Sequence, residues 1–174
     1  FKGNLSHPKS LLALNILVAN LPIILVGIWF KFFWHNYESS FLRSVPSIAL
    51  VSIFMAVFLF LGELYGKRIR NINSLNIIDA IFIGLAQVLA IIPGASRSGV
   101  TITAALLLGL DRKSSARFSF LVGIPAISLA GLIEFQESVL SSSLLNLVPL
   151  IVGILSAAFF SYISIDFLMK YLKN

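Results

Sequence analysis

The chain has 174 residues, of which 58% are hydrophobic and only 11% are charged. Soluble domains are about a quarter charged, so this balance argues strongly against an ordinary soluble domain and excludes a disordered tail. Cysteine is absent, which excludes disulfide frameworks, zinc ribbons and thiol nucleophiles, and only two histidines are present, too few for an all-histidine metal site. The net charge of +6 is concentrated between apolar runs, which is typical of a membrane protein and not of a nucleic-acid-binding protein.

From the N-terminus, the first two predicted elements are apolar stretches over residues 11–33 and 47–65. A helix needs about 20 apolar residues to cross a bilayer, so each stretch is long enough to span it. Pro22 falls inside the first stretch. We interpret it as a packing kink, because neighbouring helices can satisfy the carbonyl that a proline leaves unbonded.

The next element, residues 74–110, has a different pattern. Apolar residues run from Ile77 to Ile92, stop at Pro93-Gly94 and the polar residues after it, and resume from Val100 to Leu110. With a rise of about 1.5 Å per residue, the second run is roughly 16–18 Å long, well short of a hydrocarbon core of about 30 Å. The pattern predicts two half-length helices around a polar break, either as a broken span or as a re-entrant hairpin.

Two further apolar stretches, residues 116–135 and 147–168, complete a predicted set of four spans, with Pro125 inside the third. The distribution of charge distinguishes the two forms of the middle element, because basic residues gather on one side of a membrane protein. A broken span leaves five basic residues on one side and seven on the other, whereas a re-entrant hairpin leaves ten and two. The hairpin is favoured, and the ten residues are Lys2, Lys9, Lys67, Arg68, Arg70, Arg112, Lys113, Arg117, Lys170 and Lys173.

We therefore predict an all-α polytopic membrane protein with about four transmembrane helices and one re-entrant helical hairpin. Residues 1–174 are expected to form a single integral membrane domain, with the hairpin at about residues 74–110.

The break of the hairpin is the candidate binding site. Arg97 is expected near the middle of the membrane, where an arginine costs at least about 2.5–3.5 kcal/mol and is rarely left without a partner. The helix that begins near Gly99 directs its first N–H groups into the loop, and both helix N-termini and guanidinium groups bind anions. The pattern predicts an intramembrane site for a phosphate or a carboxylate. The residues around Arg97 that could contribute are Gly94, Ala95, Ser96, Ser98, Gly99 and Thr101.

A purely structural interpretation of the same residues stays open. Arg97 would then pair with a carboxylate on another helix, and the serines and glycines would serve close helix packing. Gln87 is as compatible with packing as with a role in the site, and Ala80 and Gly84 predict a small-residue packing face.

The remaining charges are interpreted as structural. Glu63 with Lys67 and Asp166 with Lys170 have the spacing of helical ion pairs. Asp79 suits the N-terminal end of a helix, and Asp111 suits a solvated turn.

The stretch Pro93-Gly94-Ala95-Ser96-Arg97-Ser98-Gly99-Val100-Thr101 matches the pattern Pro-Gly-x-Ser-Arg-Ser-Gly-x-Thr at every fixed position. Residues 108–112 and 116–121 fit the continuation of the same pattern. In these features the sequence resembles the undecaprenyl-diphosphate phosphatase family, UppP, also called the BacA bacitracin-resistance family. The resemblance extends more loosely from about Lys9 to the C-terminus.

The resemblance implies hydrolysis of the terminal phosphate of undecaprenyl diphosphate. This reaction regenerates undecaprenyl phosphate, the lipid carrier for peptidoglycan and other envelope polymers, and confers bacitracin resistance. The implied partners are the polyprenyl diphosphate and membrane lipids, with no nucleic acid, and a homodimer is an open alternative. The implied location is the bacterial inner (plasma) membrane.

The family's roles carry over to matching residues. Arg97 would clamp the diphosphate, Ser96 and Ser98 would contact it, and Thr101 would line the pocket. Whether Ser96 acts as a nucleophile or as a phosphate ligand stays open. The residues assigned to substrate binding are Gly94, Ala95, Gly99 and Gln87.

The family also has a first re-entrant element, with a Glu-x-x-x-Glu pair and a Ser-Ser-x-Gly-His segment, and usually one more C-terminal span. These 174 residues match neither. We expect the chain to be the central and C-terminal part of a longer protein, half of an inverted-repeat architecture, and to be inactive alone. The divalent cation that the family implies, Mg²⁺ or Ca²⁺, would take its ligands from outside this chain.

Three other functions compete with the phosphatase. A flippase or anion transporter is the main alternative, because transporters also bind anions where discontinuous helices meet in the membrane. A second lipid phosphatase superfamily carries Ser-Arg-x5-His-x3-Asp, which fails here at Thr103 and Leu107. A structural membrane subunit leaves Arg97 unexplained.

Overall fold

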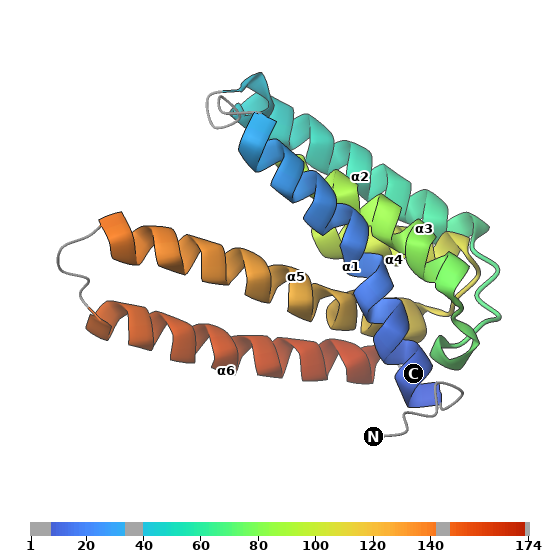
Figure 1. Cartoon of the computed structure of the whole chain (residues 1–174). Helices are drawn as coiled ribbons and strands as arrows, with labels where there is room; N and C mark the ends of the chain where they lie inside the picture. The colour runs from blue at the N-terminus through green and yellow to red at the C-terminus, as the bar shows by residue number, and fades with distance from the viewer. Residues whose placement is uncertain (1–7, 34–39, 142–146, 173–174) are drawn as a thin grey trace. The chain divides into compact units, whose positions relative to one another are not determined.

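The computed structural model describes residues 8–33, 40–141 and 147–172. Within these ranges the secondary structure is helical apart from turns and loops, as predicted. The α-helices of the described residues, labelled in Figure 1, are α1 Pro8–Phe33, α2 Val45–Tyr65, α3 Ile77–Gln87, α4 Arg97–Leu107, α5 Arg112–Ser141 and α6 Leu147–Tyr171. Three short 3-10 helices join them: η2 Phe41–Arg43, η3 Ile72–Ser74 and η4 Val88–Ile91. The backbone falls into two compact units, Phe1–Ala126 and Ile127–Asn174.

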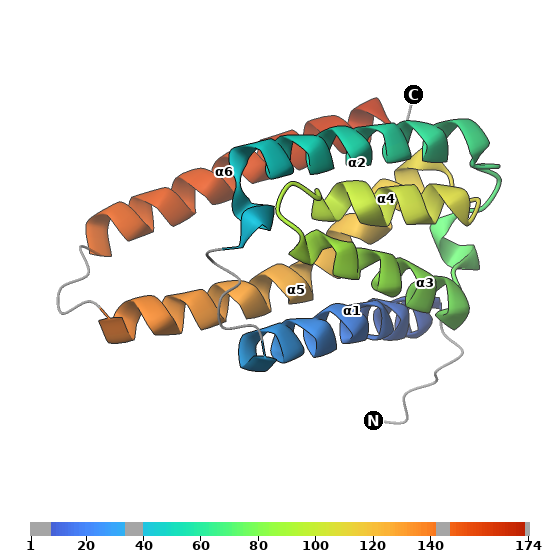
Figure 2. The ribbon, with the colours of Figure 1, turned by 90° about the horizontal axis from the view of Figure 1, so that it is seen from above.

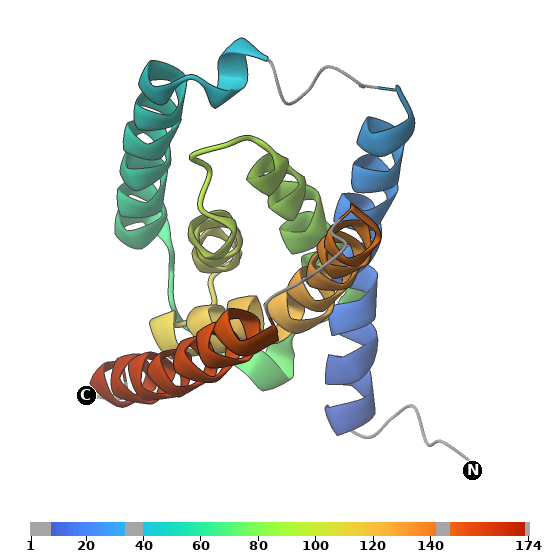
Figure 3. The same ribbon diagram turned by 90° about the vertical axis from the view of Figure 1, so that its left-hand side faces the viewer.

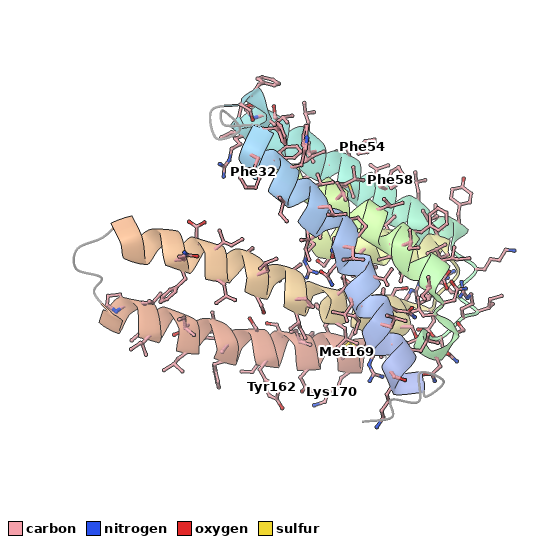
Figure 4. All side chains as sticks on the ribbon, viewed as in Figure 1. Phe32, Phe54, Phe58, Tyr162, Met169 and Lys170 are labelled. Atoms are coloured by element: carbon pink, nitrogen blue, oxygen red, sulfur yellow. The ribbon has the colours of Figure 1, made fainter. Side chains whose placement is uncertain are left out.

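Four of the helices are long and apolar enough to cross a membrane, which confirms the four predicted spans. The apolar segments within them are Lys9–Phe30, Val45–Tyr65, Arg112–Gln136 and Pro149–Tyr171. Many of their apolar side chains face outward. On α2, for example, the labelled side chains of Phe54 and Phe58 (Figure 4) are 62% and 42% exposed. Such surfaces are stable against lipid and unfavourable in water.

The middle element is a helical hairpin whose two ends meet. Helices α3 and α4, of 11 residues each, lie side by side and run in opposite directions (Figure 2). At the open end, the N–H of Arg70 donates to the carbonyl of Gly109 at 2.9 Å, and the N–H of Asp111 donates to the carbonyl of Arg70 at 2.8 Å. The chain therefore leaves the hairpin beside the point where it entered, as the re-entrant form requires.

Side-chain caps set the start of the helices at this open end. Asn76 and Asp79 form a reciprocal capping box at the N-terminus of α3, with hydrogen bonds of 2.9 and 3.0 Å. Asp111 accepts from the N–H of Ser114 at 2.6 Å and thereby caps α5. Asp111, predicted to lie in a solvated turn, therefore lies at the start of a helix. Asp79 lies at the N-terminal end of a helix, as predicted.

One predicted ion pair is wrong. Glu63 pairs with Arg68 at 2.5 Å and with Arg112, not with Lys67. Helix α2 ends at Tyr65, so Lys67 lies beyond the helix and the four-residue helical spacing does not apply. The second predicted pair is confirmed: Lys170 Nζ and Asp166 Oδ2 are 2.7 Å apart on α6.

The core of the first unit lies between the hairpin and the helices around it. Most of its buried members come from α1, α3, α4 and α5, and they include Ala19, Ile83, Ala105, Phe118 and Val122. Figure 3 shows the hairpin between α1 and α2. A Cβ added at Gly84 would lie 2.5 Å from the carbonyl oxygen of Ala19. Since Ala80 is also fully buried, the predicted small-residue face is confirmed as the contact of α3 with α1.

The second unit consists of the end of α5 and the whole of α6. Helix α5 continues to Ser141, and residues 142–146 lie outside the described ranges. Tyr162 and Lys170, both exposed, are labelled on α6 in Figure 4. Of the ten basic residues predicted on one side, Lys2 and Lys173 are likewise outside the described residues.

Candidate functional site

The tip of the hairpin is a tight turn built by Pro93 and Gly94. The N–H of Ala95 donates to the carbonyl of Ile92 at 3.0 Å, and Gly94 has φ +90°. Proline before a glycine of positive φ is the pattern of a type II turn. The turn rests on α2: the hydroxyl of Ser52 donates to the carbonyl of Gly94 at 3.2 Å, and a Cβ added at Gly94 would lie 2.5 Å from the carbonyl oxygen of Ile48. Glycine is therefore required here both by conformation and by space.

Immediately after the turn, Ser96 caps α4. Its Oγ accepts from the N–H of Gly99 at 3.2 Å and lies 3.3 Å from the Oγ of Ser98. No described residue accepts from the N–H groups of Arg97 and Ser98, the first two of the helix. Ser96 is exposed and Ser98 half-buried, so the hydroxyls and free amides share one polar surface at the helix N-terminus. This is the arrangement that binds anions.

The guanidinium of Arg97 lies against α5. Its Nη1 donates to the carbonyl of Ser119 at 3.4 Å, a long and therefore weak bond. A Cβ built on Gly123 would overlap the guanidinium, so the group occupies the space that a side chain at this position would fill. Among the described residues Arg97 forms no ion pair with a carboxylate. Its charge is half-buried and available to a ligand.

Thr101 is fully buried under the same loop. Its hydroxyl donates to the carbonyl of Arg97 at 3.0 Å or of Ser98 at 3.2 Å, and its Oγ1 lies 2.7 Å from the Oγ of Ser119. With the Thr101 hydrogen directed to its own helix, Ser119 is the donor in the last bond. Thr101 thus connects the Arg97 backbone to α5.

Gln87 lies at the C-terminal end of α3 and is 0% exposed. Neither its Nε2 nor its Oε1 has a hydrogen-bond partner among the described residues. Its burial without partners is unusual, because buried amides are nearly always bonded. The structure brings together Gly94, Ala95, Ser96, Arg97, Ser98, Gly99 and Thr101 in one loop and helix turn, and gives Gln87 no bond to them.

This site occurs in a chain that matches a known family throughout. The profile of the family described as "Bacitracin resistance protein BacA" covers residues 1–174. The chain belongs to the BacA family. It is 50% identical over 174 residues to a protein of Prochlorococcus marinus named "Undecaprenyl-diphosphatase", covering 100% of this chain and 60% of that protein. A protein of the same name from Synechococcus sp. (strain CC9311) is 46% identical over 173 residues, 99% of this chain and 61% of that protein.

The chain thus spans about 60% of the length of the curated BacA relatives it matches. The cation that the family resemblance implies can be tested against the side chains present. In the described part of the chain no three histidine, aspartate or glutamate side chains come together. The described residues therefore do not fit a metal site, and no step of the chemistry below passes through a cation.

Two residues of this BacA site escaped sequence reasoning. Ser119 and Gly123 contact Thr101 and Arg97, yet the sequence analysis assigned no role in the site to either residue. Their signal is weak but present: Ser115, Ser119 and Gly123 recur every four residues, which places small residues on one face of a helix. All three are buried.

Proposed function

We propose that this chain forms the phosphate-binding part of an undecaprenyl-diphosphate phosphatase of the plasma membrane. The observation that carries the proposal is the half-buried guanidinium of Arg97, without a described carboxylate partner, beside a helix N-terminus with two free amides. The names of the 46–50% identical relatives support the same substrate.

The chemistry follows from where charge develops. In phosphoryl transfer, negative charge spreads over the oxygens of the transferred group, so fixed positive charge and N–H donors lower the barrier. Arg97 can bind two phosphate oxygens at once, and the N–H groups of Arg97 and Ser98 can bind a third. Because this arrangement is held by the turn and the cap before substrate arrives, it needs little reorganisation.

The two serines are assigned as phosphate ligands. The described bonds of Ser96 are with the N–H of Gly99 and the hydroxyl of Ser98, neither of which is a base. One of the two hydroxyls donates to the other, and the remaining hydroxyl hydrogen can donate to a phosphate oxygen.

The test is phosphate release in detergent from farnesyl diphosphate and undecaprenyl diphosphate. The enzyme is a chimera in which residues 1–174 replace the matching segment of the Prochlorococcus marinus relative, with that relative as the positive control. We expect release by the chimera and a fall of about 100-fold or more in kcat/KM for Arg97→Ala, since loss of one such electrostatic contact costs about that much.

Arg117→Ala is the matched control, because Arg117 is exposed on α5 and is expected to leave kcat/KM within about twofold. A folded chimera that releases no phosphate while the relative does would exclude the phosphatase. If that chimera still binds the diphosphate, the transport alternative takes its place.

A further inference from the structure

We propose that one turn of α5, from Ser119 to Gly123, is a cradle that positions the guanidinium of Arg97. Ser119 and Gly123 are then positioning residues, which act on the substrate only through Arg97 and Thr101. The inference rests on the proposed function, because Arg97 is the main cationic group of the proposed phosphate site.

Gly123 supplies the space. A Cβ added there would lie 2.5 Å from Cζ of Arg97 and closer still to both terminal nitrogens, so a methyl group and the observed guanidinium cannot coexist. By contrast, a Cβ at Gly131, eight residues further along α5, would meet no atom within 4 Å. The bare backbone at Gly123 is thus matched to Arg97 and is not a general property of this helix.

Ser119 contacts both the side chain of Arg97 and the hydroxyl of Thr101. Its carbonyl accepts from Nη1 of Arg97, and its hydroxyl donates to Thr101 at 2.7 Å. Thr101 in turn donates to the carbonyl of Arg97 at 3.0 Å. One residue of α5 therefore holds both the side chain of Arg97 and, through Thr101, its backbone. Ser119 is only 1% exposed and Thr101 is 0% exposed, so water does not compete for this bond.

The geometry indicates a positioning role because the one direct hydrogen bond from α5 to the Arg97 side chain is weak. A single weak bond of 3.4 Å does not anchor a flexible arginine, whereas the space left by the missing side chain of Gly123 gives its flat end a place to lie. A displacement of about 1 Å can lower a rate by about 100-fold. The cradle thus adds a contact on α5 to a flexible side chain that begins at the first residue of α4.

The test uses the chimera described above with substitutions at each position. Gly123→Val fills the slot, and we expect it to lower kcat/KM by about 100-fold, with Gly123→Ala intermediate. Because the guanidinium ends a flexible side chain, it moves aside and the helix stays folded. Ser119→Ala removes one buried hydrogen bond and is expected to lower kcat/KM about five- to tenfold. Ser119→Thr keeps the hydroxyl and is expected to restore most of that loss.

Matched controls lie on the same helix. Gly131→Val and Ser128→Ala alter exposed positions of α5 and are expected to change kcat/KM by less than about twofold. Melting temperatures in detergent identify any variant whose loss of activity reflects unfolding. If Gly123→Val or Ser119→Ala unfolds, the kcat/KM of Gly123→Ala or Ser119→Thr is compared with that of the wild type instead.

A double-mutant cycle separates positioning from general packing. If Gly123 acts only through Arg97, then Gly123→Val in the Arg97→Ala background lowers kcat/KM by less than about twofold further. A further loss as large as in the wild-type background would overturn the cradle. So would wild-type activity in a folded Gly123→Val variant.

Binding of inorganic pyrophosphate, measured by isothermal titration calorimetry, distinguishes this inference from the proposed function. The chimera could show no turnover while Gly123→Val still lowers its pyrophosphate affinity about tenfold or more. That result would support the cradle and contradict the phosphatase. Turnover in the wild type with unchanged kcat/KM and affinity in that variant removes the cradle and keeps the phosphatase.

Discussion

At the hairpin tip, local sequence determines the conformation of the turn, and contacts with a distant helix determine its position. Pro93 and Gly94 define a turn that their own backbone preferences predict. The carbonyl of Ile48, which excludes any side chain at Gly94, comes from α2 and is not visible in the local pattern. The turn therefore fixes the path of the chain, and α2 fixes where the turn lies.

Gly94→Ala tests this division. We expect a loss of about 1–3 kcal/mol of stability, because alanine must adopt φ near +90° and meet the carbonyl of Ile48. The measurement is the thermal midpoint in detergent. Gly27→Ala is the control, since no atom lies within 4 Å of an added Cβ on that part of α1. An equal midpoint for both variants would mean that the tip is not held against α2.

At the scale of elements, the open end of the hairpin is fastened by Arg70. Its guanidinium binds both carboxylate oxygens of Asp79, at 3.0 and 2.5 Å, as well as the carbonyls of Ser74 and Leu108. One side chain thus joins the entry loop, the start of α3 and the end of α4. Burial by itself would raise the pKa of Asp79, but hydrogen bonds from Arg70 and from the N–H of Asn76, with the charge of Arg70, outweigh it and lower the pKa.

This direction gives a pH prediction. A carboxylate whose pKa is lowered on folding stabilises the folded state above its unfolded pKa, and the contribution is lost as the pH falls below about 4. We expect Asp79→Asn to lose about 1.5–3 kcal/mol at pH 7 and to show a flatter decline of the thermal midpoint between about pH 5 and pH 3. Asp166→Asn, in an exposed pair on α6, serves as the control. Parallel pH curves for wild type and Asp79→Asn would contradict the assignment.

At the scale of the whole molecule, the hairpin determines which loops share a side of the membrane. Because Arg70 is bonded to Gly109 and Asp111, the loop after α2 and the start of α5 lie at the same end of the first unit. The contacts of Glu63 with Arg68 and Arg112 join the same two regions. This agrees with the distribution of basic residues, which favoured re-entry over crossing.

The absence of cysteine makes this arrangement directly measurable. Single substitutions Lys67→Cys, Lys113→Cys and Arg43→Cys introduce one reactive thiol each into oriented membrane vesicles. We expect a membrane-impermeant maleimide to label Lys67→Cys and Lys113→Cys from one side and Arg43→Cys from the other. Labelling of Lys67→Cys and Lys113→Cys from opposite sides would show that the hairpin crosses the membrane.

Most of the architecture could be predicted from the sequence because it depends on local properties. Span length follows from runs of apolar residues, the hairpin from a Pro-Gly break and the side preference of basic residues, and the anion site from Arg97 beside a helix start. The pair of Glu63 with Lys67 failed for the complementary reason: it assumed that α2 continues beyond Tyr65.

The sequence by itself determined that this is a helical membrane protein with an arginine-containing loop between two half-length helices. The tertiary structure decided what surrounds that loop. Ser52 of α2 donates a hydrogen bond to the turn. On α5, Ser119 bonds to Thr101 and Gly123 leaves space for Arg97. Gln87 is buried without a described partner. These contacts join residues 18 to 42 positions apart, and local periodicity specifies a helix face without specifying which other helix will cover it.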